Sequence, residues 1–459
     1  MKPRTTGCSD LDTNKSDVFS DYLFEFINSE LSCKVVERAA LSLLDYLGVA
    51  IAGSFELRDK TDKIIDGFGC KNGKVNIIGQ NRKTELLNAV FVNALNGHVL
   101  ELDDGSRFGM MHPGVPVITA VLNAVQHFHK NRTDLIKGIV SGYQAAIMLA
   151  TAAQPSHKER GFHATATCGA IGAAVGVASV LNLDRNQLKN AIAAAVTGAG
   201  GSLKVIESGS QLKPLNAARA ALTGLSSALT AKAGFYGPDD VFGGDNGFFK
   251  AMTNVQSENA FVNIDKNDYL IMHSYMKPYA ACRHCHSPIE AVLNIVNREK
   301  IDFEQIKSIH VDTYKWAVKG HDHSQIRDIS SAKMSIPYSV AAAAVFKSGG
   351  MDSFTEKTVK NDKVLRLTKL VSVSENDKLT MQVPGKRAAI VTLNVNDYIF
   401  NETVELPKGE PENPLTREDV IEKFNSLLQF SGKTQKYADR LCGAVFDRNL
   451  SLRKMFKLI

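Results

Sequence analysis

The sequence predicts a mainly α-helical protein in which both ends of the chain build a large all-α domain and a smaller α+β domain is inserted between them. Apolar residues recur at helical intervals through most of the first 268 residues. Runs of Ala, Gly and Val in the middle of the chain leave little side-chain bulk, which lets helices pack closely. Segments rich in β-branched residues occur only after about residue 270. We therefore expect a helical domain over 1–268 and 405–459, and an α+β domain over 269–404.

Helical spacing of apolar residues predicts five helices in the first part of the chain: Asp17–Ile27, Lys34–Ile51, Thr84–Leu100, Val117–Lys130 and Thr133–Ala152. No segment there alternates as a strand does. The apolar run Cys168–Leu181 is shorter than the roughly 20 residues that span a bilayer, so we interpret it as a buried helix and expect no membrane association. A further helix should begin at Lys213 and Pro214, since proline suits the first helical turn.

The second part of the chain mixes helices and strands. Ser287-Pro288-Ile289-Glu290 has the form of a capping box and predicts a helix that runs towards Arg298. Strands are expected over Ile306–Tyr314, Lys369–Ser374 and Arg387–Val395, and a helix over Ile336–Phe346. Thr416 and Asp419 form a second cap, which predicts that the chain ends in helices.

Composition limits the classes of function. With 54 Lys and Arg against 48 Asp and Glu, the net charge of +6 is small for a polyanion-binding protein, and the single Trp316 leaves little for base stacking. We expect no nucleic-acid partner, whereas a small anionic substrate is compatible. Seven cysteines in a long chain do not form a disulfide framework, and the N-terminus has no apolar signal segment, so we expect a reducing, cytoplasmic location.

Three segments place ionisable residues beside glycines or helix starts. The first is a turn with both charge signs, bounded by two apolar helices, that carries His98, Glu101, Asp103, Asp104, Arg107 and His112. In the second, His163 precedes a small-residue helix whose first amides favour anions, and in the third Lys213 lies at a helix start. The alternatives are solvated acids at a helix end, a core histidine and a surface lysine.

The densest segment is Cys282-Arg283-His284-Cys285-His286. Its C-x-x-C-H pattern matches covalent haem attachment, which requires an export signal that the chain lacks. A zinc site from its two thiols and two imidazoles is an alternative, although no second cysteine pair completes it. We favour a clamp in which Arg283, His284 and His286 bind carboxylates beside a helix N-terminus. Tyr338, at the start of a later helix, is either a site residue or a buried structural tyrosine.

The ordered set of these motifs resembles the MmgE/PrpD family, which includes 2-methylcitrate dehydratase, cis-aconitate decarboxylase and iminodisuccinate epimerase. The motifs are LDDG…HPG, RGFH, Lys-Pro before a helix, GFYGPDDVFGG, KPYAACRHCH and a Tyr before an Ala-rich helix. The resemblance implies that the α+β domain is a lid, that the protein is a homodimer, and that no metal or organic cofactor is needed. It also implies a site made of His112, His163, Lys213, His286 and Tyr338, with Glu101, Asp103 and Asp104 beside them. Gly105 and Asn216 depart from the family pattern, which has Thr and often His there.

The residue types themselves predict proton chemistry on a carboxylate. The sequence has no P-loop and no nucleophile elbow, so neither phosphoryl nor acyl transfer is indicated. Histidine and tyrosine transfer protons, while lysine and arginine neutralise the charge that develops when a proton α to a carboxylate is removed. We expect a lyase of small di- or tricarboxylates, of the 2-methylcitrate dehydratase type. The alternatives are a dicarboxylate epimerase, a cis-aconitate decarboxylase and a carboxylate-binding protein without activity.

Overall fold

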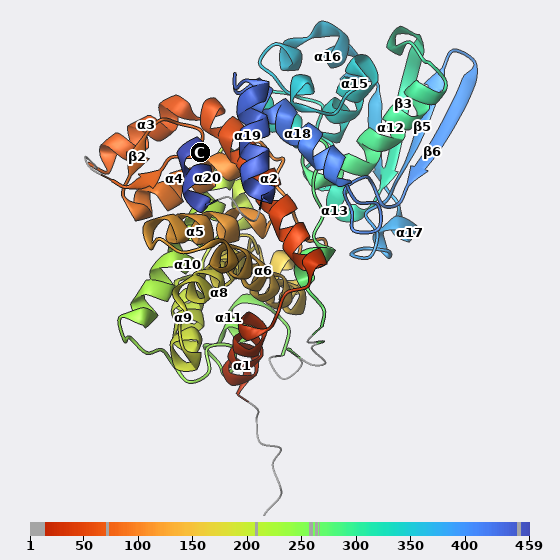
Figure 1. Ribbon diagram of the computed structural model, residues 1–459. Helices are drawn as coiled ribbons and strands as arrows, with labels where there is room; N and C mark the ends of the chain where they lie inside the picture. The colour runs from red at the N-terminus through yellow and green to blue at the C-terminus, as the bar shows by residue number, and fades with distance from the viewer. Residues whose placement is uncertain are drawn as a thin grey trace, which may run out of the picture.

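A computed structural model describes residues 14–459, apart from 70–72, 207–209, 257–259, 262–264, 266 and 448–450. Residues 1–13, on which the expectation about a signal segment rests, lie outside the described residues. Of the chain, 59% is helical and 9% is strand, which confirms the mainly α fold class. Figure 1 shows a helical body from the first half of the chain, beside a smaller part that contains the larger sheet.

Eleven helices and one two-stranded ribbon occur before residue 253 in the described part of the chain. The helices are α1 (Lys15–Asn28), α2 (Cys33–Glu56), α3 (Arg58–Gly67), α4 (Leu86–His98), α5 (Gly114–His127), α6 (Arg132–Ala153), α7 (Ser156–Glu159), α8 (Thr167–Leu181), α9 (Arg185–Gly198), α10 (Lys213–Lys232) and α11 (Phe248–Met252). The ribbon pairs β1 (Val75–Asn76) with β2 (Lys83–Thr84) in antiparallel register. The expected helices are therefore confirmed. The expectation that this half contains no strand is wrong, because β1 and β2 form a short ribbon.

The small-residue helices form the centre of the helical core. All residues of α8 are buried, as expected for the run that ends at Leu181. A Cβ atom on Gly172 would lie 2.5 Å from the Cβ of Ala146 and 2.6 Å from the carbonyl oxygen of Gly142, so α6 and α8 touch backbone to backbone. Helix α6 is long and apolar enough to cross a membrane, but 78% of its apolar stretch is buried inside the protein.

The smaller part contains a four-stranded sheet packed against helices. Strands β3 (Ile306–Thr313), β4 (Val371–Glu375), β5 (Ala389–Val395) and β6 (Tyr398–Val404) lie in the order β4-β3-β5-β6, with β3 and β4 parallel and the other pairs antiparallel. The helices are α12 (His286–Arg298), α13 (Lys315–Val318), α14 (Ile329–Lys333), α15 (Ile336–Phe346), α16 (Asp362–Thr368) and α17 (Asp377–Thr380). Strand β6 was not predicted, because it is an edge strand whose Tyr398 and Ile399 are 70% and 66% exposed.

The predicted capping box at Ser287 is wrong. A 3₁₀ turn over Arg283–Cys285 leads directly into α12, which begins at His286, so Ser287 is already inside the helix. Its hydroxyl donates to the carbonyl oxygen of Arg387 at 2.6 Å, and the Glu290 carboxylate accepts from the backbone N–H of Lys408. Both side chains therefore tie α12 to the segments beside it.

The chain ends in three helices, α18 (Arg417–Phe430), α19 (Gln435–Phe446) and α20 (Leu452–Leu458). The capping box of Thr416 and Asp419 at the start of α18 is confirmed. Val420, Phe424 and Leu428 belong to the core of the helical body, and Figure 1 shows these C-terminal helices beside α2.

The close approach of α6 and α8 gives a stability prediction. Gly172→Ala should lower the free energy of unfolding by about 1–3 kcal/mol, because the added methyl group has no space. The matched control is Gly443→Ala in the exposed face of α19, where no atom lies within 4 Å of the new Cβ. This control should gain about 0.5–1 kcal/mol from the loss of a helical glycine. Urea denaturation of both variants tests the packing, and equal effects would contradict it.

Candidate active site

The turn between α4 and α5 carries five of the predicted site residues, and it is buried. Glu101, Asp103, Asp104 and Arg107 are each less than 8% exposed. Glu101 adopts a left-handed conformation with φ of 56°, which few non-glycine residues do. Gly105 pairs with Tyr275, and a Cβ atom there would lie 2.2 Å from the tyrosine oxygen. The backbone of the turn therefore packs against the segment that leads into the second part of the protein.

Glu101 lies between two buried lysines. Its carboxylate oxygens lie 2.5 and 2.6 Å from Nζ of Lys213, the first residue of α10. Nζ of Lys277 donates to the Glu101 carbonyl oxygen at 2.9 Å and lies 3.6 Å from the carboxylate. Burial alone would raise the pKa of Glu101, but these ammonium groups hold it well below the usual value. Glu101 in turn raises the pKa of Lys213 against the effect of burial, so this pair is charged, whereas burial lowers the pKa of Lys277.

His112 presents an unprotonated nitrogen. Its Nδ1 lies 2.7 Å from the carbonyl oxygen of Asp104, and because a carbonyl oxygen only accepts, Nδ1 carries the proton. Burial lowers the pKa of His112 to about 3, although the Asp103 carboxylate 3.6 Å away opposes the shift. The imidazole is therefore neutral at pH 7 with a free lone pair on Nε2. Such a group can act as a general base.

His163 is held in the opposite tautomer. Nδ2 of Asn216 donates to the carbonyl oxygen of Ser202 at 3.2 Å, which identifies this atom as the amide nitrogen. The same nitrogen lies 3.1 Å from Nδ1 of His163, so Nδ1 accepts a hydrogen bond and the ring proton is on Nε2. Burial lowers the pKa of His163 well below its usual value. His163 is therefore a neutral hydrogen-bond donor, and Asn216, which departs from the family pattern, fixes its tautomer.

The two aspartates of the turn differ in environment. Asp103 accepts from Nδ1 of His98 at 2.7 Å, and the nearby histidines hold its pKa below the usual value although burial would raise it. Its second oxygen, Oδ1, has no hydrogen-bond partner among the described residues. Asp104 accepts from the hydroxyl of Tyr143 and the N–H of Gly114, and burial raises its pKa to about 7. Asp104 thus supports the turn, while Asp103 keeps a free oxygen.

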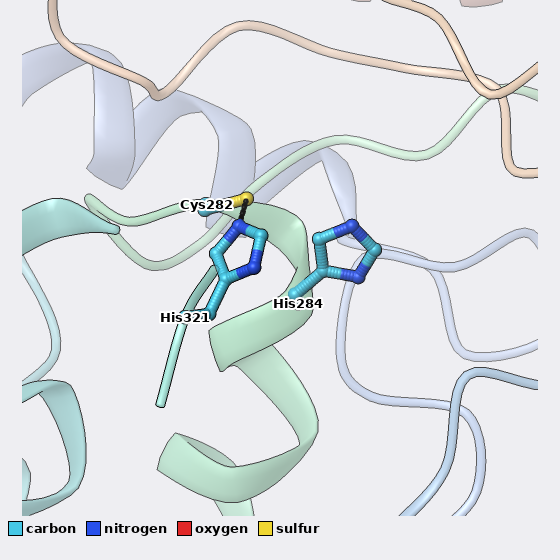
Figure 2. Close-up of side chains that lie close together, drawn as sticks. All are labelled: Cys282, His284 and His321. Carbon is cyan, nitrogen blue, oxygen red and sulfur yellow. Dashed lines mark hydrogen bonds between the residues drawn. The ribbon is translucent and has the colours of Figure 1, made fainter. Parts of the chain in front are cut away.

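The second part of the protein contributes a cluster of a thiol and two imidazoles. Figure 2 shows Cys282 and His284, from the segment leading into α12, together with His321 from the loop after α13. Sγ of Cys282 lies 3.4 Å from Nε2 of His321, and one ligand atom from each of the three residues lies within 4.8 Å of the others. These atoms could hold a metal ion such as zinc. The zinc alternative of the sequence analysis therefore named two ligands that are not in this group, Cys285 and His286, and missed His321.

Charged side chains of the helical body act on the pKa values of this cluster. The charges of Lys213 and Glu101 both act on the pKa of Cys282, and Lys213 also acts on that of His284. Lys158 of α7 and Arg387 act on His284 as well. The ammonium group of Lys213 therefore lies near enough to Cys282 and His284 of the second part to act on their pKa values.

Arg283 of the predicted clamp and Arg107 of the predicted turn are already paired. Arg283 donates to Glu410 at 2.7 Å, and Arg107 donates to the same carboxylate at 3.0 Å and to Glu412. In contrast, no carboxylate lies within salt-bridge distance of Arg387 or Lys158 in the described part of the chain. Burial lowers the pKa of Lys158 to about 8. These two cations, which the sequence analysis missed, are available for a carboxylate ligand.

Two predicted residues lie apart from this group. The hydroxyl of Tyr338 donates to the carbonyl oxygen of Ser353 at 2.9 Å, and its ring packs on Phe354 in the core of the second part. His286 is fully buried, with Nδ1 near Arg283 and Nε2 near the carbonyl oxygen of Ala281. Both side chains therefore fit the structural alternative rather than a contact with substrate.

Sequence reasoning missed Lys158, Lys277, His321 and Arg387 as site residues. Lys277 stands in the KPYAACRHCH motif and could have been found there. The other three are single ionisable residues without a motif, and only the folded chain brings them to the cluster.

The raised pKa of Asp104 predicts a pH-dependent stability. In the folded protein Asp104 holds its proton up to about pH 7, whereas an unfolded aspartate releases it near pH 3.9. Between these values the folded state binds more protons, so its stability falls as pH rises, by at most about 1.4 kcal/mol per pH unit. Asp104→Asn should remove this slope while keeping the contacts with Tyr143 and Gly114. Chemical denaturation at pH 5 and 7.5 tests this, and parallel curves for both proteins would contradict it.

Comparison with known proteins assigns the chain to a family. Residues 17–259 match the MmgE/PrpD N-terminal domain and residues 279–446 match the MmgE/PrpD C-terminal domain. A cis-aconitate decarboxylase-like protein of Aspergillus oryzae is 25% identical over 437 residues, covering 89% of each chain. A cis-aconitate decarboxylase of Aspergillus terreus is 24% identical over 430 residues, covering 87% of this chain and 86% of that protein. The human cis-aconitate decarboxylase is 27% identical over 228 residues, covering 48% and 46%. The protein belongs to the MmgE/PrpD family, as its motifs indicate.

Proposed function

We propose that the protein is a lyase that acts on a small tricarboxylate, or a closely related dicarboxylate, by proton transfer at the carbon α to a carboxylate. The observation that carries this proposal is the pair of neutral histidines of opposite tautomer. His112 offers a lone pair on Nε2 and His163 offers a proton on Nε2. A base and a hydrogen-bond donor are thereby both available at neutral pH.

The surrounding charges suit such a reaction. Removing a proton α to a carboxylate places a second negative charge on the same group, and this is unfavourable unless cations are already in position. Lys213 and Lys277 are neutralised only in part by Glu101, while Arg387 and Lys158 have no carboxylate partner within the described residues. An anionic substrate would therefore bind more tightly as its charge increases towards the transition state.

Two reactions of this class are favoured by different observations. The two histidines favour loss of water, in which His112 takes the α proton and returns it to the leaving hydroxyl group, so that water departs, while Nε2–H of His163 donates a hydrogen bond to that oxygen. The similarity to proteins named cis-aconitate decarboxylase or cis-aconitate decarboxylase-like favours loss of CO₂, after which an acid protonates the resulting carbanion. In both cases we propose a substrate of the citrate or aconitate type, and epimerisation of a dicarboxylate follows as a third possibility.

The proposed activity is tested by incubation in heavy water with 2-methylcitrate, citrate, cis-aconitate, iminodisuccinate and tartrate, followed by NMR. At least one acid should lose water or CO₂ or exchange its α proton for deuterium. Each reaction leaves a distinct product, so the same spectra identify the reaction. Tight binding without exchange for every acid would instead make the protein a carboxylate-binding protein.

The role of the histidines gives a second test. His112→Gln and His163→Gln should each lower kcat by about 10²-fold or more, with a smaller change of KM, because the first variant removes the proton transfer and the second removes the imidazole that donates to the leaving group. His127→Gln, at the exposed end of α5, is the matched control and should leave both constants unchanged. Unchanged kcat in both site variants, with intact circular dichroism, would rule out these roles.

A further inference from the structure

Three consecutive carbonyl oxygens of the turn after α4 each accept a hydrogen bond from a lysine side chain. The lysines come from three separate segments, which are α14, the segment before α12, and α18. The pairs are Lys333 with Leu100 at 3.0 Å, Lys277 with Glu101 at 2.9 Å and Lys423 with Leu102 at 2.8 Å. The backbone of the turn is therefore fixed at three successive peptide groups.

The side chains of this turn alternate between the two parts of the protein. Leu100 and Leu102 are almost fully buried and belong to the apolar core of the second part. Glu101, between them, binds Lys213 of the helical body. Apolar packing thus attaches the turn to the second part, and this attachment remains when one lysine is removed. The lysine bonds therefore act on the conformation of the turn rather than on its attachment.

Lys333 connects the two halves of the candidate site. Its Nζ donates to the carbonyl oxygen of Leu100, one residue before Glu101. Its own carbonyl oxygen accepts from the backbone N–H of Cys282 at 2.9 Å, where the Cys282–His286 segment begins. A single residue thereby bonds to the turn through its side chain and to this segment through its backbone. The placement of one half relative to the other depends on it.

The packing of the second part does not account for a charged side chain at Lys333. The residue is 3% exposed, and its ammonium group has three donors but one hydrogen bond, to Leu100. Burial lowers the pKa of Lys333 to about 8, which the carboxylates of Glu101 and Glu56 oppose from beyond salt-bridge distance. A buried charge without an ion-pair partner is destabilising. Methionine has a similar length and would avoid this cost, so the bond to Leu100 is what the lysine adds.

We propose that Lys333 is a positioning residue of the candidate active site, an inference that rests on the proposed function. The Leu100 carbonyl belongs to the peptide that precedes Glu101, whose φ of 56° is a conformation that few non-glycine residues adopt. Lys333 holds the peptide before Glu101 and Lys277 holds the peptide after it. Together they direct the Glu101 carboxylate at Lys213 and place the residues of the turn that follow, including His112.

The kinetic test is Lys333→Met, with the acid that the NMR panel identifies as substrate. We expect kcat to fall by about 10- to 10²-fold while KM changes by less than about threefold, because the turn is misplaced but the cations that bind the substrate remain. The matched control is Lys433→Met, which removes a bond of the same kind to the carbonyl oxygen of Gly79, before α19, and should leave both constants unchanged. Unchanged kcat in Lys333→Met, or a raised KM with unchanged kcat, would overturn the proposal and leave the proposed function intact.

Urea denaturation separates positioning from a general structural role. The midpoint of Lys333→Met should stay close to that of the wild type, because the loss of one hydrogen bond and the removal of a buried charge have opposite effects on stability. If this variant does not fold, Lys333→Gln replaces it with the same expected results. A clearly lower midpoint in both variants would make Lys333 a structural residue and overturn the proposal.

A crystal structure of Lys333→Met gives a readout that is independent of activity. It should show the peptide between Leu100 and Glu101 rotated and the Glu101 carboxylate displaced from Lys213. An unchanged turn would overturn the positioning role whatever the kinetics. A wild type that is inactive on all five acids would overturn the proposed function, and the crystal structure alone would then decide whether Lys333 positions the turn.

Discussion

The buried carboxylate of Glu101 is the interaction on which the site depends. It binds Lys213 at the start of α10, and its own carbonyl group accepts from Lys277 in the segment that leads into the second part of the protein. Three segments far apart in the sequence are thereby brought together. Since removal of one partner from a buried ion pair costs about 3–5 kcal/mol, the turn is strongly held in this position. The same carboxylate serves two lysines, so it cannot neutralise both when they are charged.

A second buried carboxylate joins the two parts of the protein and explains why the expected clamp is not free. Glu410 follows the sheet and pairs with Arg283 before α12 and with Arg107 in the turn after α4. The two arginines therefore neutralise a structural anion and position the turn. Arg387, which donates to the carbonyl oxygen of Arg107, lies next to this network without a carboxylate partner in the described chain. The proposed function therefore assigns anion binding to Arg387 and Lys158.

The helical body was predictable because its elements are long and strictly periodic, and the same holds for α15, whose bounds coincide with the predicted Ile336–Phe346. The expectation that the turn residues share a site with His163 and Lys213 came from the resemblance to the family. The sequence could not show which charged and polar side chains pair with one another or with backbone carbonyl groups. Whether an arginine is free depends on Glu410, more than 120 positions from Arg283. The structural roles of Ser287 and Tyr338 likewise depend on carbonyl groups of Arg387 and Ser353, which no local pattern identifies.

The most direct test of the account is a crystal structure of the protein with a bound tricarboxylate that the NMR panel identifies as a substrate. We predict that its carboxylates contact Arg387 and Lys158 and that its reacting carbon lies about 3–3.5 Å from Nε2 of His112. The contrary result is binding in the cavity of about 300 Å³ that α18 forms with Leu102, Pro278 and Lys408, with His112 untouched. That outcome would show that His112 and His163 do not act on the substrate.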